Sequence, residues 1–307
     1  MRYTNDSWLE GFFVQGVLHG FVRKYDAKNR LESFGYYDNG KPAWIWWKLI
    51  EGGGAVVGFV DHVTGDLTGS EIAYIYPDFK TGFLGHFEEG QLKSAQAVHL
   101  ESIMTENNVL IPLFSDPEGP VYRPDVSDLV NITAQPLLPD PYESQMVEVK
   151  TSTVPGANEG LFCKQPVDPG TILAFYNGIR REPKKTFDKP DWNKSAYRIF
   201  DPTRKKGSLD IPNEFVSLSN YCATLAHKTN HSFLPSAEFE VYDHPRFGLV
   251  PCLMTNTDIR AGEEIFVHYG YDLDRCPDWY SDAWDHDIYP VPESFKDLTA
   301  QTDETET

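Results

Sequence analysis

The sequence predicts a mostly β protein, and two patterns in the chain support this fold class. Between residues 11 and 90, a glycine, two bulky residues and a later glycine recur four times, beginning at Gly11, Gly35, Gly58 and Gly85. From Met146 to about residue 271, short apolar runs alternate with turn signals rich in proline and glycine. Runs of this kind, bounded by glycine and proline, are typical of strands joined by turns.

The N-terminal repeat predicts a sheet of hairpins. The lead glycines are 24, 23 and 27 residues apart, and each is followed by one turn glycine of this set: Gly16, Gly40, Gly65 and Gly90. One hairpin cannot bury its own apolar face, so successive hairpins are expected to pair into a continuous antiparallel sheet. The unit resembles the MORN repeat, and this resemblance assigns residues 1–111 to a MORN-repeat β-sheet domain.

A proline-rich segment follows at residues 112–145. Its seven prolines interrupt any long helix or strand, and they are Pro112, Pro117, Pro120, Pro124, Pro136, Pro139 and Pro141. The stretch from Leu137 to Tyr142 is too apolar for a flexible linker and predicts an ordered connector instead.

The balance of charge excludes some classes of function. The chain has 27 Lys and Arg against 46 Asp and Glu, a formal net charge of -19. Non-specific binding of nucleic acid needs a basic surface, so no direct nucleic-acid binding is expected. An acidic surface favours basic partners such as lysine-rich tails, although acidity that only keeps the chain in solution explains the charge equally well.

Cysteine usage and hydropathy indicate the compartment. The four cysteines, at Cys163, Cys222, Cys252 and Cys276, show neither the spacing of a zinc cluster nor a disulfide framework. The N-terminal residues lack the features of a signal peptide, and no apolar run approaches the length of a membrane span. We therefore expect an intracellular protein, nuclear or cytoplasmic or both, without a metal.

Four short segments carry the chemical interpretation. In chain order they are Glu159-Gly160-Leu161-Phe162, Tyr176-Asn177-Gly178, Asn230-His231-Ser232-Phe233 and Tyr269-Gly270-Tyr271-Asp272. Each one alone is more simply interpreted as a strand start, a strand end or a turn. In this order, with Arg260 to Ile265 leading into the last, they resemble the SET domain of protein-lysine methyltransferases. With its N-terminal repeats, the chain is similar to SET-domain histone-lysine N-methyltransferases that carry MORN repeats.

This resemblance implies a fold, a division of the chain and a reaction. Residues 146–272 would form a SET catalytic domain of small β-sheets, with a C-terminal pseudoknot that is a rare exception to unthreaded topology. Residues 273–298 would close the cofactor site with a short helix, and residues 299–307 would be a disordered tail. The implied reaction transfers a methyl group from S-adenosylmethionine to lysines of histone H3 tails and other basic proteins, leaving S-adenosylhomocysteine.

The resemblance also assigns roles to single residues. Tyr176, Phe239, Tyr269 and Tyr271 would line a channel for the target lysine, with the three tyrosines as catalytic residues and Tyr269 nearest the reacting centre. A lysine with an ordinary pKa of about 10.4 must lose its proton first, and burial beside a sulfonium lowers that pKa. Tyr269 would orient the amine rather than act as the base.

The implied cofactor site draws on residues from three parts of the chain. Its members would be Ala157, Asn158, Glu159, Lys228, Asn230, His231 and Trp279. Lys228 would pair with the cofactor's carboxylate and Trp279 would stack on its adenine, while His227 would support this region. A buried core tryptophan is the alternative interpretation of Trp279.

Two departures from the family pattern bear on function. Only Cys276 follows Tyr271, so the three-cysteine zinc cluster that closes many SET sites is not expected here. Phe239 stands where similar enzymes have tyrosine, whose hydroxyl can hold a water in the space that a second methyl needs. The sequence therefore predicts a mixture of mono- and dimethylated lysine.

Two other functions compete with this hypothesis. A catalytically inactive MORN/SET scaffold or binding protein would keep the fold without the chemistry, and a small-molecule methyltransferase would need a different substrate channel. A decayed enzyme is expected to lose at least one channel or cofactor residue, whereas all six of these are present: Tyr176, Asn230, His231, Tyr269, Tyr271 and Trp279. The sequence therefore favours the active protein-lysine methyltransferase.

Overall fold

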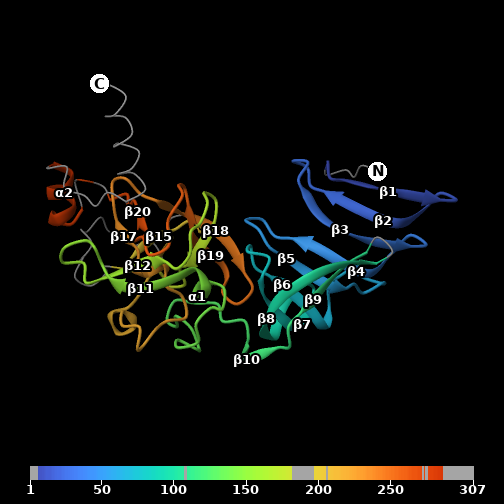
Figure 1. The fold of residues 1–307 in the computed structure, drawn as a ribbon, viewed down its shortest axis with the longest axis horizontal. Coiled ribbons are helices and arrows are strands. Elements are labelled where there is room, and N and C mark those ends of the chain that lie inside the picture. The colour runs from blue at the N-terminus through green and yellow to red at the C-terminus, as the bar shows by residue number, and fades with distance from the viewer. Residues whose placement is uncertain are drawn as a thin grey trace, which may run out of the picture. The chain divides into compact units, whose positions relative to one another are not determined.

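A computed structural model describes residues 6–106, 109–181, 197–204, 207–271, 273 and 276–285 of the chain. The chain divides into two compact units, drawn in Figure 1. Unit 1 comprises Met1–Pro124 with Asp243–Gly248, and unit 2 comprises Asp125–Tyr242 with Leu249–Thr307. Strands make up most of the regular structure in both units, which confirms the mostly β fold class.

Unit 1 is built on one antiparallel sheet of ten strands. The strand order is β1-β2-β3-β4-β5-β6-β7-β8-β10, and β9 pairs with β8. The bounds are β1 (Trp8–Val14), β2 (Val17–Tyr25), β3 (Leu31–Asp38), β4 (Lys41–Leu49), β5 (Ala55–Phe59), β6 (Gly69–Ile75), β7 (Thr81–Glu88), β8 (Gln91–Glu106), β9 (Val109–Phe114) and β10 (Glu118–Tyr122). The four predicted hairpins are the pairs β1–β2, β3–β4, β5–β6 and β7–β8.

The two glycines of a repeat have different structural roles, as the β3–β4 hairpin shows. Its turn is Asn39-Gly40, with φ values of 48° and 80°, which suits the two-residue turn that matches strand twist. The lead glycine, Gly35, lies under the Trp46 ring, and a Cβ there would come within 2.4 Å of it. The repeat therefore preserves one tight turn and one close approach of an aromatic ring to the neighbouring strand.

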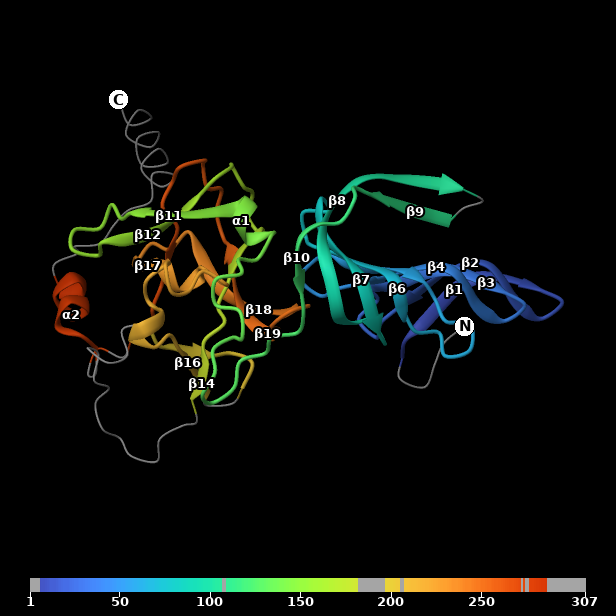
Figure 2. The ribbon, with the colours of Figure 1, turned by 90° about the horizontal axis from the view of Figure 1, so that it is seen from below.

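The core of unit 1 lies under the β8–β9 hairpin. Six buried side chains of β4, β5 and β6 form its centre: Ile45, Trp47, Ala55, Val57, Ala73 and Ile75. Leu110 and Phe114 of β9 pack against them, and Trp47 Nε1 donates to the Leu110 carbonyl at 2.9 Å. In Figure 2, β9 and the C-terminal half of β8, with which it pairs, extend over the sheet. One face of β4, β5 and β6 is thereby removed from water, which a lone hairpin could not achieve.

The proline-rich segment carries short elements rather than none. Residues 112–145 include the end of β9, the whole of β10 and most of helix α1 (Glu143–Met146). Pro112 and Pro120 lie in β9 and β10, at the edges of the sheet, where a missing backbone N–H costs no ladder hydrogen bond.

Unit 2 consists of three small sheets. The first is β11 (Val147–Thr151) with β12 (Glu159–Cys163). The second has the order β13-β19-β18-β20-β17, with β13 (Ile172–Phe175), β17 (Asn230–His231), β18 (Ala237–His244), β19 (Gly248–Thr255) and β20 (Phe266–Val267). The third has the order β14-β16-β15, with β14 (Ile179–Arg181), β15 (Ile199–Asp201) and β16 (Gly207–Asp210). Two 3-10 turns complete the unit, η1 (Asn213–Phe215) and η2 (Ala226–Lys228).

One parallel pairing positions the functional site. β17 pairs with β20 so that Asn230 lies opposite Phe266 and His231 opposite Val267. Tyr269 follows β20 by two residues, and its backbone N–H donates to His231 Nδ1 at 3.1 Å. The Asn-His and Tyr-Gly-Tyr segments, which are distant in the sequence, therefore lie side by side.

The C-terminal segment contributes helix α2 (Asp278–Asp285), in the region where a short helix was expected. The predicted disordered tail at residues 299–307 lies outside the described residues. Among the described residues, no helix is both long and apolar enough to cross a membrane. In that same part of the chain, no three His, Cys, Asp or Glu side chains gather where a metal ion could be held.

Candidate active site

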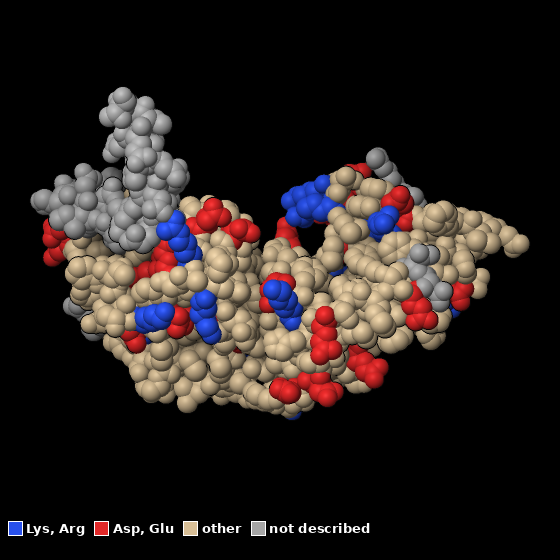
Figure 3. All heavy atoms as spheres, viewed as in Figure 1, with Lys and Arg blue, Asp and Glu red and all other residues tan. Residues whose placement is uncertain are grey.

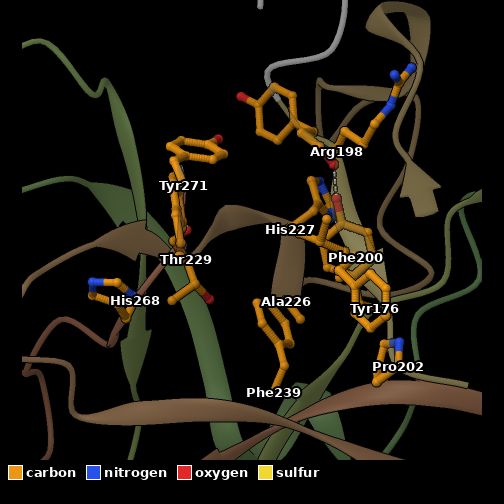
Figure 4. Close-up of a pocket in the computed structure, with 14 residues that line it drawn as sticks. Tyr176, Arg198, Phe200, Pro202, Ala226, His227, Thr229, Phe239, His268 and Tyr271 are labelled. Atoms are coloured by element: carbon orange, nitrogen blue, oxygen red, sulfur yellow. Dashed lines mark hydrogen bonds between the residues drawn. The ribbon is translucent and has the colours of Figure 1, made fainter. Parts of the chain in front are cut away.

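A cavity of about 390 Å³ in unit 2 contains all four residues predicted for the lysine channel. Most of its lining is aromatic or carries a hydroxyl: Tyr176, Tyr197, Arg198, Ile199, Phe200, Pro202, Ala226, His227, Thr229, Phe239, His268, Tyr269, Gly270 and Tyr271. In Figure 4, Tyr271, Thr229 and His268 lie on one side and Tyr176, His227 and Phe200 on the other. We call this space the channel cavity.

The hydroxyls of the channel cavity are held by backbone carbonyls. Tyr269 Oη donates to the Thr229 carbonyl at 2.8 Å, and Tyr176 Oη donates to the Tyr197 carbonyl. Burial raises the pKa of Tyr176 and of Tyr269 far above the ordinary tyrosine value, and raises the pKa of Tyr271 to about 12. Because the Tyr176 and Tyr269 phenols stay protonated and their hydrogens are already donated, their oxygens are left as acceptors for an amine.

Phe239 contributes a wall without a hydroxyl. Its ring meets the Tyr176 ring edge to face, with centroids 5.9 Å apart and an interplanar angle of 81°. Phe239 thus lies in the wall of this cavity beside Tyr176, and its role in a lysine channel stays a prediction.

His227 is buried in the wall of the channel cavity. Burial lowers the pKa of His227 to about 3, so its imidazole is neutral at physiological pH. Neither ring nitrogen makes a hydrogen bond of normal geometry within the described part of the chain, and the same holds for Thr229 Oγ1. His227 lines the channel cavity, and its support of the cofactor region stays a prediction.

A second cavity, of about 620 Å³, lies beside the first. It is lined by the turn between β11 and β12, by β17 and by the start of α2: Val154, Pro155, Gly156, Ala157, Tyr197, Asn230, His231, Tyr269, Tyr271, Pro277 and Trp279. Tyr197, Tyr269 and Tyr271 line both cavities. We call the second space the cofactor cavity, and these three tyrosines are the wall that the two cavities share.

The residues predicted for the cofactor divide into two groups. Ala157, Asn230, His231 and Trp279 line the cofactor cavity, whereas Asn158, Glu159 and Lys228 do not. Lys228 Nζ instead contacts Glu159 Oε2 at 2.5 Å and the Val216 carbonyl at 2.7 Å. In the structure, Lys228 forms an ion pair with Glu159. The predicted pairing of Lys228 with the cofactor's carboxylate stays a prediction.

His231 and Trp279 give the cofactor cavity its aromatic side. Burial lowers the pKa of His231 to about 4, so this ring is neutral at physiological pH. Trp279 is 50% exposed and its ring centroid is 6.1 Å from that of His231, so the interpretation of Trp279 as a buried core residue is wrong. An open indole face is suited to stacking on a planar ligand.

Sequence reasoning did not predict two of the lining residues, Tyr197 and Arg198. Tyr197 has no motif around it, although it lines both cavities. Arg198, the next residue, lines the channel cavity and donates from Nη2 to Asp210 Oδ2 at 2.8 Å. The aromatic run of which they are part offered only a strand signal.

Comparison with known proteins identifies the family. A model for the N-terminal region of the histone H3 K4-specific methyltransferase SET7 matches residues 36–110, and a SET-domain model matches residues 158–270. The histone-lysine N-methyltransferase SETD7 of Halocynthia roretzi is 37% identical over an alignment of 268 residues, and the match covers 84% of this chain and 68% of that protein. The chain belongs to the SETD7 family of histone-lysine N-methyltransferases. As a SETD7-family enzyme it is an S-adenosylmethionine-dependent lysine methyltransferase.

Solved structures with partial similarity to this SETD7-family chain match it at lower sequence identity. KRYPTONITE, in complex with mCHH DNA, an H3(1-15) peptide and SAH, is 18% identical with a TM-score of 0.30, over 43% of this chain and 25% of that chain. The Chaetomium thermophilum polycomb repressive complex 2 is 19% identical with a TM-score of 0.30, over 42% of this chain and 16% of that chain.

The cofactor cavity fits the group that SET domains use. Its volume lies within the range of about 300–1,000 Å³ that is usual for small-molecule sites. Its lining combines the backbone of a turn and an asparagine, which suit the amino-acid end of S-adenosylmethionine, with open aromatic faces, which suit its sulfonium and its adenine.

Proposed function

We propose that this enzyme methylates lysines of histone H3 tails and of other basic protein segments, adding one methyl group and, to a fraction of the product, a second. The observation that carries the proposal is the wall of Tyr197, Tyr269 and Tyr271 between a narrow aromatic cavity and a larger one. Transfer of a methyl group requires the amine, the methyl carbon and the sulfur to lie on one line. Two cavities that meet at one wall suit a reaction between two separately bound molecules.

The channel cavity supports this chemistry through burial and hydrogen bonding. S-adenosylmethionine supplies an electrophilic methyl group on a positively charged sulfur. The channel side chains Tyr176, Phe239 and His227 exclude water and lower the pKa of an entering lysine, since burial disfavours its charged form. Tyr269 and Tyr176 orient the amine by accepting its hydrogen bonds. The neutral His227 ring adds no positive charge that would oppose entry of the lysine.

In the cofactor cavity, Ala157, Asn230 and His231 are proposed to bind the cofactor, with Trp279 stacked on its adenine and the Asn158–Glu159 backbone adjacent.

The acidic net charge of -19 favours basic substrates over acidic ones. Acidic and basic side chains both appear on each unit in the face shown in Figure 3. Attraction of a basic tail is therefore attributed to the charge of the whole protein. Such substrates place the enzyme's action in the nucleus, with further targets in the cytoplasm.

The test is transfer to a panel of lysine peptides, including H3 tail sequences, with S-adenosylmethionine and detection of products by mass spectrometry. Lysine peptides with gains of one and two methyl groups are expected, because Phe239 lacks the hydroxyl that would hold a water beside the amine. Only monomethyl-lysine after long reaction would contradict the product proposal. Cofactor binding without transfer to any lysine would favour a scaffold function instead.

A further inference from the structure

A buried carboxylate beside the cofactor cavity has no role in the mechanism above. Glu264 follows the Ala261-Gly262-Glu263 turn, precedes β20 and is 3% exposed. Four donors converge on its two oxygens. Ser152 Oγ donates to Oε1 at 2.7 Å, the Thr153 N–H donates to Oε2 at 2.7 Å, and Thr153 Oγ1 and Asn230 Nδ2 supply the other two bonds. A buried carboxylate is retained only when it is satisfied in this way.

The donors come from two segments that build the cofactor cavity. Ser152 and Thr153 directly precede the turn 154–157, which lines that cavity, and Asn230 lines it from β17. Glu264 thus links the base of the turn to the asparagine. Space is reserved for this link, because a Cβ on Gly160 would lie 2.1 Å from Glu264 Oε1. A side chain at this position would displace the Glu264 carboxylate from its present place.

Glu264 also decides which way the Asn230 amide points. Asn230 Nδ2 lies 3.0 Å from Glu264 Oε1, 2.9 Å from the Glu159 carbonyl oxygen and 3.0 Å from Ser152 Oγ. A reversed amide would place Oδ1 against the carboxylate and the carbonyl, which are both acceptors and cannot donate to it. With its nitrogen committed, Asn230 can offer a ligand in the cofactor cavity only its oxygen.

We propose that Glu264 is a positioning residue of the cofactor site: it anchors the turn 154–157 and fixes Asn230 so that Oδ1 accepts a hydrogen bond from the ammonium of the cofactor's amino-acid end. This inference rests on the proposed function and deepens it. An amide of undefined orientation would present a donor to that ammonium in part of the molecules and would weaken binding.

Glu264→Gln tests the proposal with little change in shape. Glutamine replaces one acceptor oxygen by a donor, and neither the Thr153 N–H nor Asn230 Nδ2 can accept from it. The dissociation constant of S-adenosylhomocysteine, measured by calorimetry, should rise about tenfold or more, as expected when a hydrogen bond to a charged group is lost. KM for S-adenosylmethionine should rise in parallel, while kcat at saturating cofactor changes less than about threefold.

The matched control is the neighbouring Glu263→Gln. The Glu263 carboxylate accepts from the Arg260 N–H within its own turn, at 3.1 Å, whereas Ser152, Thr153 and Asn230 donate to Glu264. This variant should bind S-adenosylhomocysteine within about twofold of wild type. A thermal melt of each variant separates loss of folding from loss of binding. If Glu264→Gln does not fold, Ser152→Ala removes one donor to the same carboxylate and should weaken binding about threefold to fivefold.

A double variant tests whether Glu264 acts through the asparagine. The combined cost of Glu264→Gln and Asn230→Ala should be smaller than the sum of the single costs, because both remove the same oriented oxygen. Wild-type affinity in Glu264→Gln would overturn the inference. If Glu264→Gln does not fold, wild-type affinity in Ser152→Ala would overturn it instead. Strictly additive costs in the double variant would also overturn it. Failure of the wild-type enzyme to bind S-adenosylhomocysteine would instead overturn the proposed function.

Discussion

The two cavities share three tyrosines but differ in how their other walls are held. In the channel cavity, Thr229 is 3% exposed, and the Tyr176 and Tyr269 hydroxyls are fixed by backbone carbonyls. In the cofactor cavity, Trp279 on α2 is 50% exposed. The channel lining is therefore held by burial and hydrogen bonds, whereas the outer wall of the cofactor cavity depends on an exposed side chain. Chemistry should be sensitive to the first set of walls, and cofactor affinity to the second.

The largest expected effect is on chemistry and comes from the shared wall. Tyr269→Phe removes the hydroxyl that would orient the amine, while it keeps the ring that lines both cavities. We expect kcat to fall on the order of 100-fold, as is usual when one oriented hydrogen-bonding group is lost from an active site. The dissociation constant of S-adenosylhomocysteine should change less than about threefold. A parallel loss in cofactor binding would break the distinction between the two cavities.

The next effect is on stability and concerns the histidine of the channel cavity. In the unfolded chain a histidine binds its proton near pH 6.5, whereas burial lowers the pKa of His227 in the folded chain to about 3. Below pH 6.5 the unfolded state therefore gains a proton that the folded state does not, and stability present above pH 6.5 is lost as the pH falls. Between pH 6.5 and pH 5 the loss should be about 2 kcal/mol.

Chemical denaturation at the two pH values measures this loss, and His227→Gln provides the comparison. The variant should lose less unfolding free energy than wild type over the same interval, because glutamine does not titrate. His231, whose pKa burial lowers to about 4, adds a similar contribution from the cofactor cavity and remains in both proteins. Equal losses in variant and wild type would show that His227 is not the group responsible.

The exposed Trp279 in the wall of the cofactor cavity predicts a smaller effect, on cofactor affinity rather than on kcat. Trp279→Ala should raise the dissociation constant of S-adenosylhomocysteine about tenfold, in line with alanine substitution of a side chain that stacks on a base. Because half of the indole is exposed, the fold should tolerate the change. At saturating S-adenosylmethionine, kcat should stay within about twofold of wild type. A large fall in kcat with unchanged affinity would place Trp279 with the channel residues.

The smallest effect is on the product ratio. Phe239→Tyr restores a hydroxyl beside Tyr176, where it can hold a water in the space that a second methyl needs. We expect the ratio of dimethyl- to monomethyl-lysine to fall about fivefold, which corresponds to one hydrogen bond of about 1 kcal/mol. Mass spectrometry of one peptide at matched extents of reaction gives the ratio. An unchanged ratio would mean that the channel does not select product at Phe239.

Sequence reasoning predicted the regular parts of this molecule well. Each hairpin of unit 1 depends on residues next to one another, such as Asn39 and Gly40 in a turn, so a local repeat was sufficient. The close approach of Gly35 to Trp46 and the cover that Leu110 gives to Trp47 involve partners on other strands. No local pattern specifies such partners, and the coordinates were needed to find them.

The candidate site was predictable where a motif marked it. Resemblance to a known family placed Tyr176, Phe239 and Tyr269 in one cavity, although periodicity alone would not have paired β17 with β20. It did not find Tyr197, which lies outside every motif. Glu264 was visible within a motif, yet its function depends on Ser152, 112 residues away, and on the orientation of one amide.

The wall of Tyr197, Tyr269 and Tyr271 has a consequence for inhibition. Two ligands bound on opposite sides of one wall can be joined by a short covalent link without leaving their positions. The second arm of such a compound then binds at the high effective concentration set by the first. A molecule that carries an aminoalkyl chain on an adenosine scaffold would exploit this arrangement, and its selectivity would come from the channel lining rather than from the adenosine.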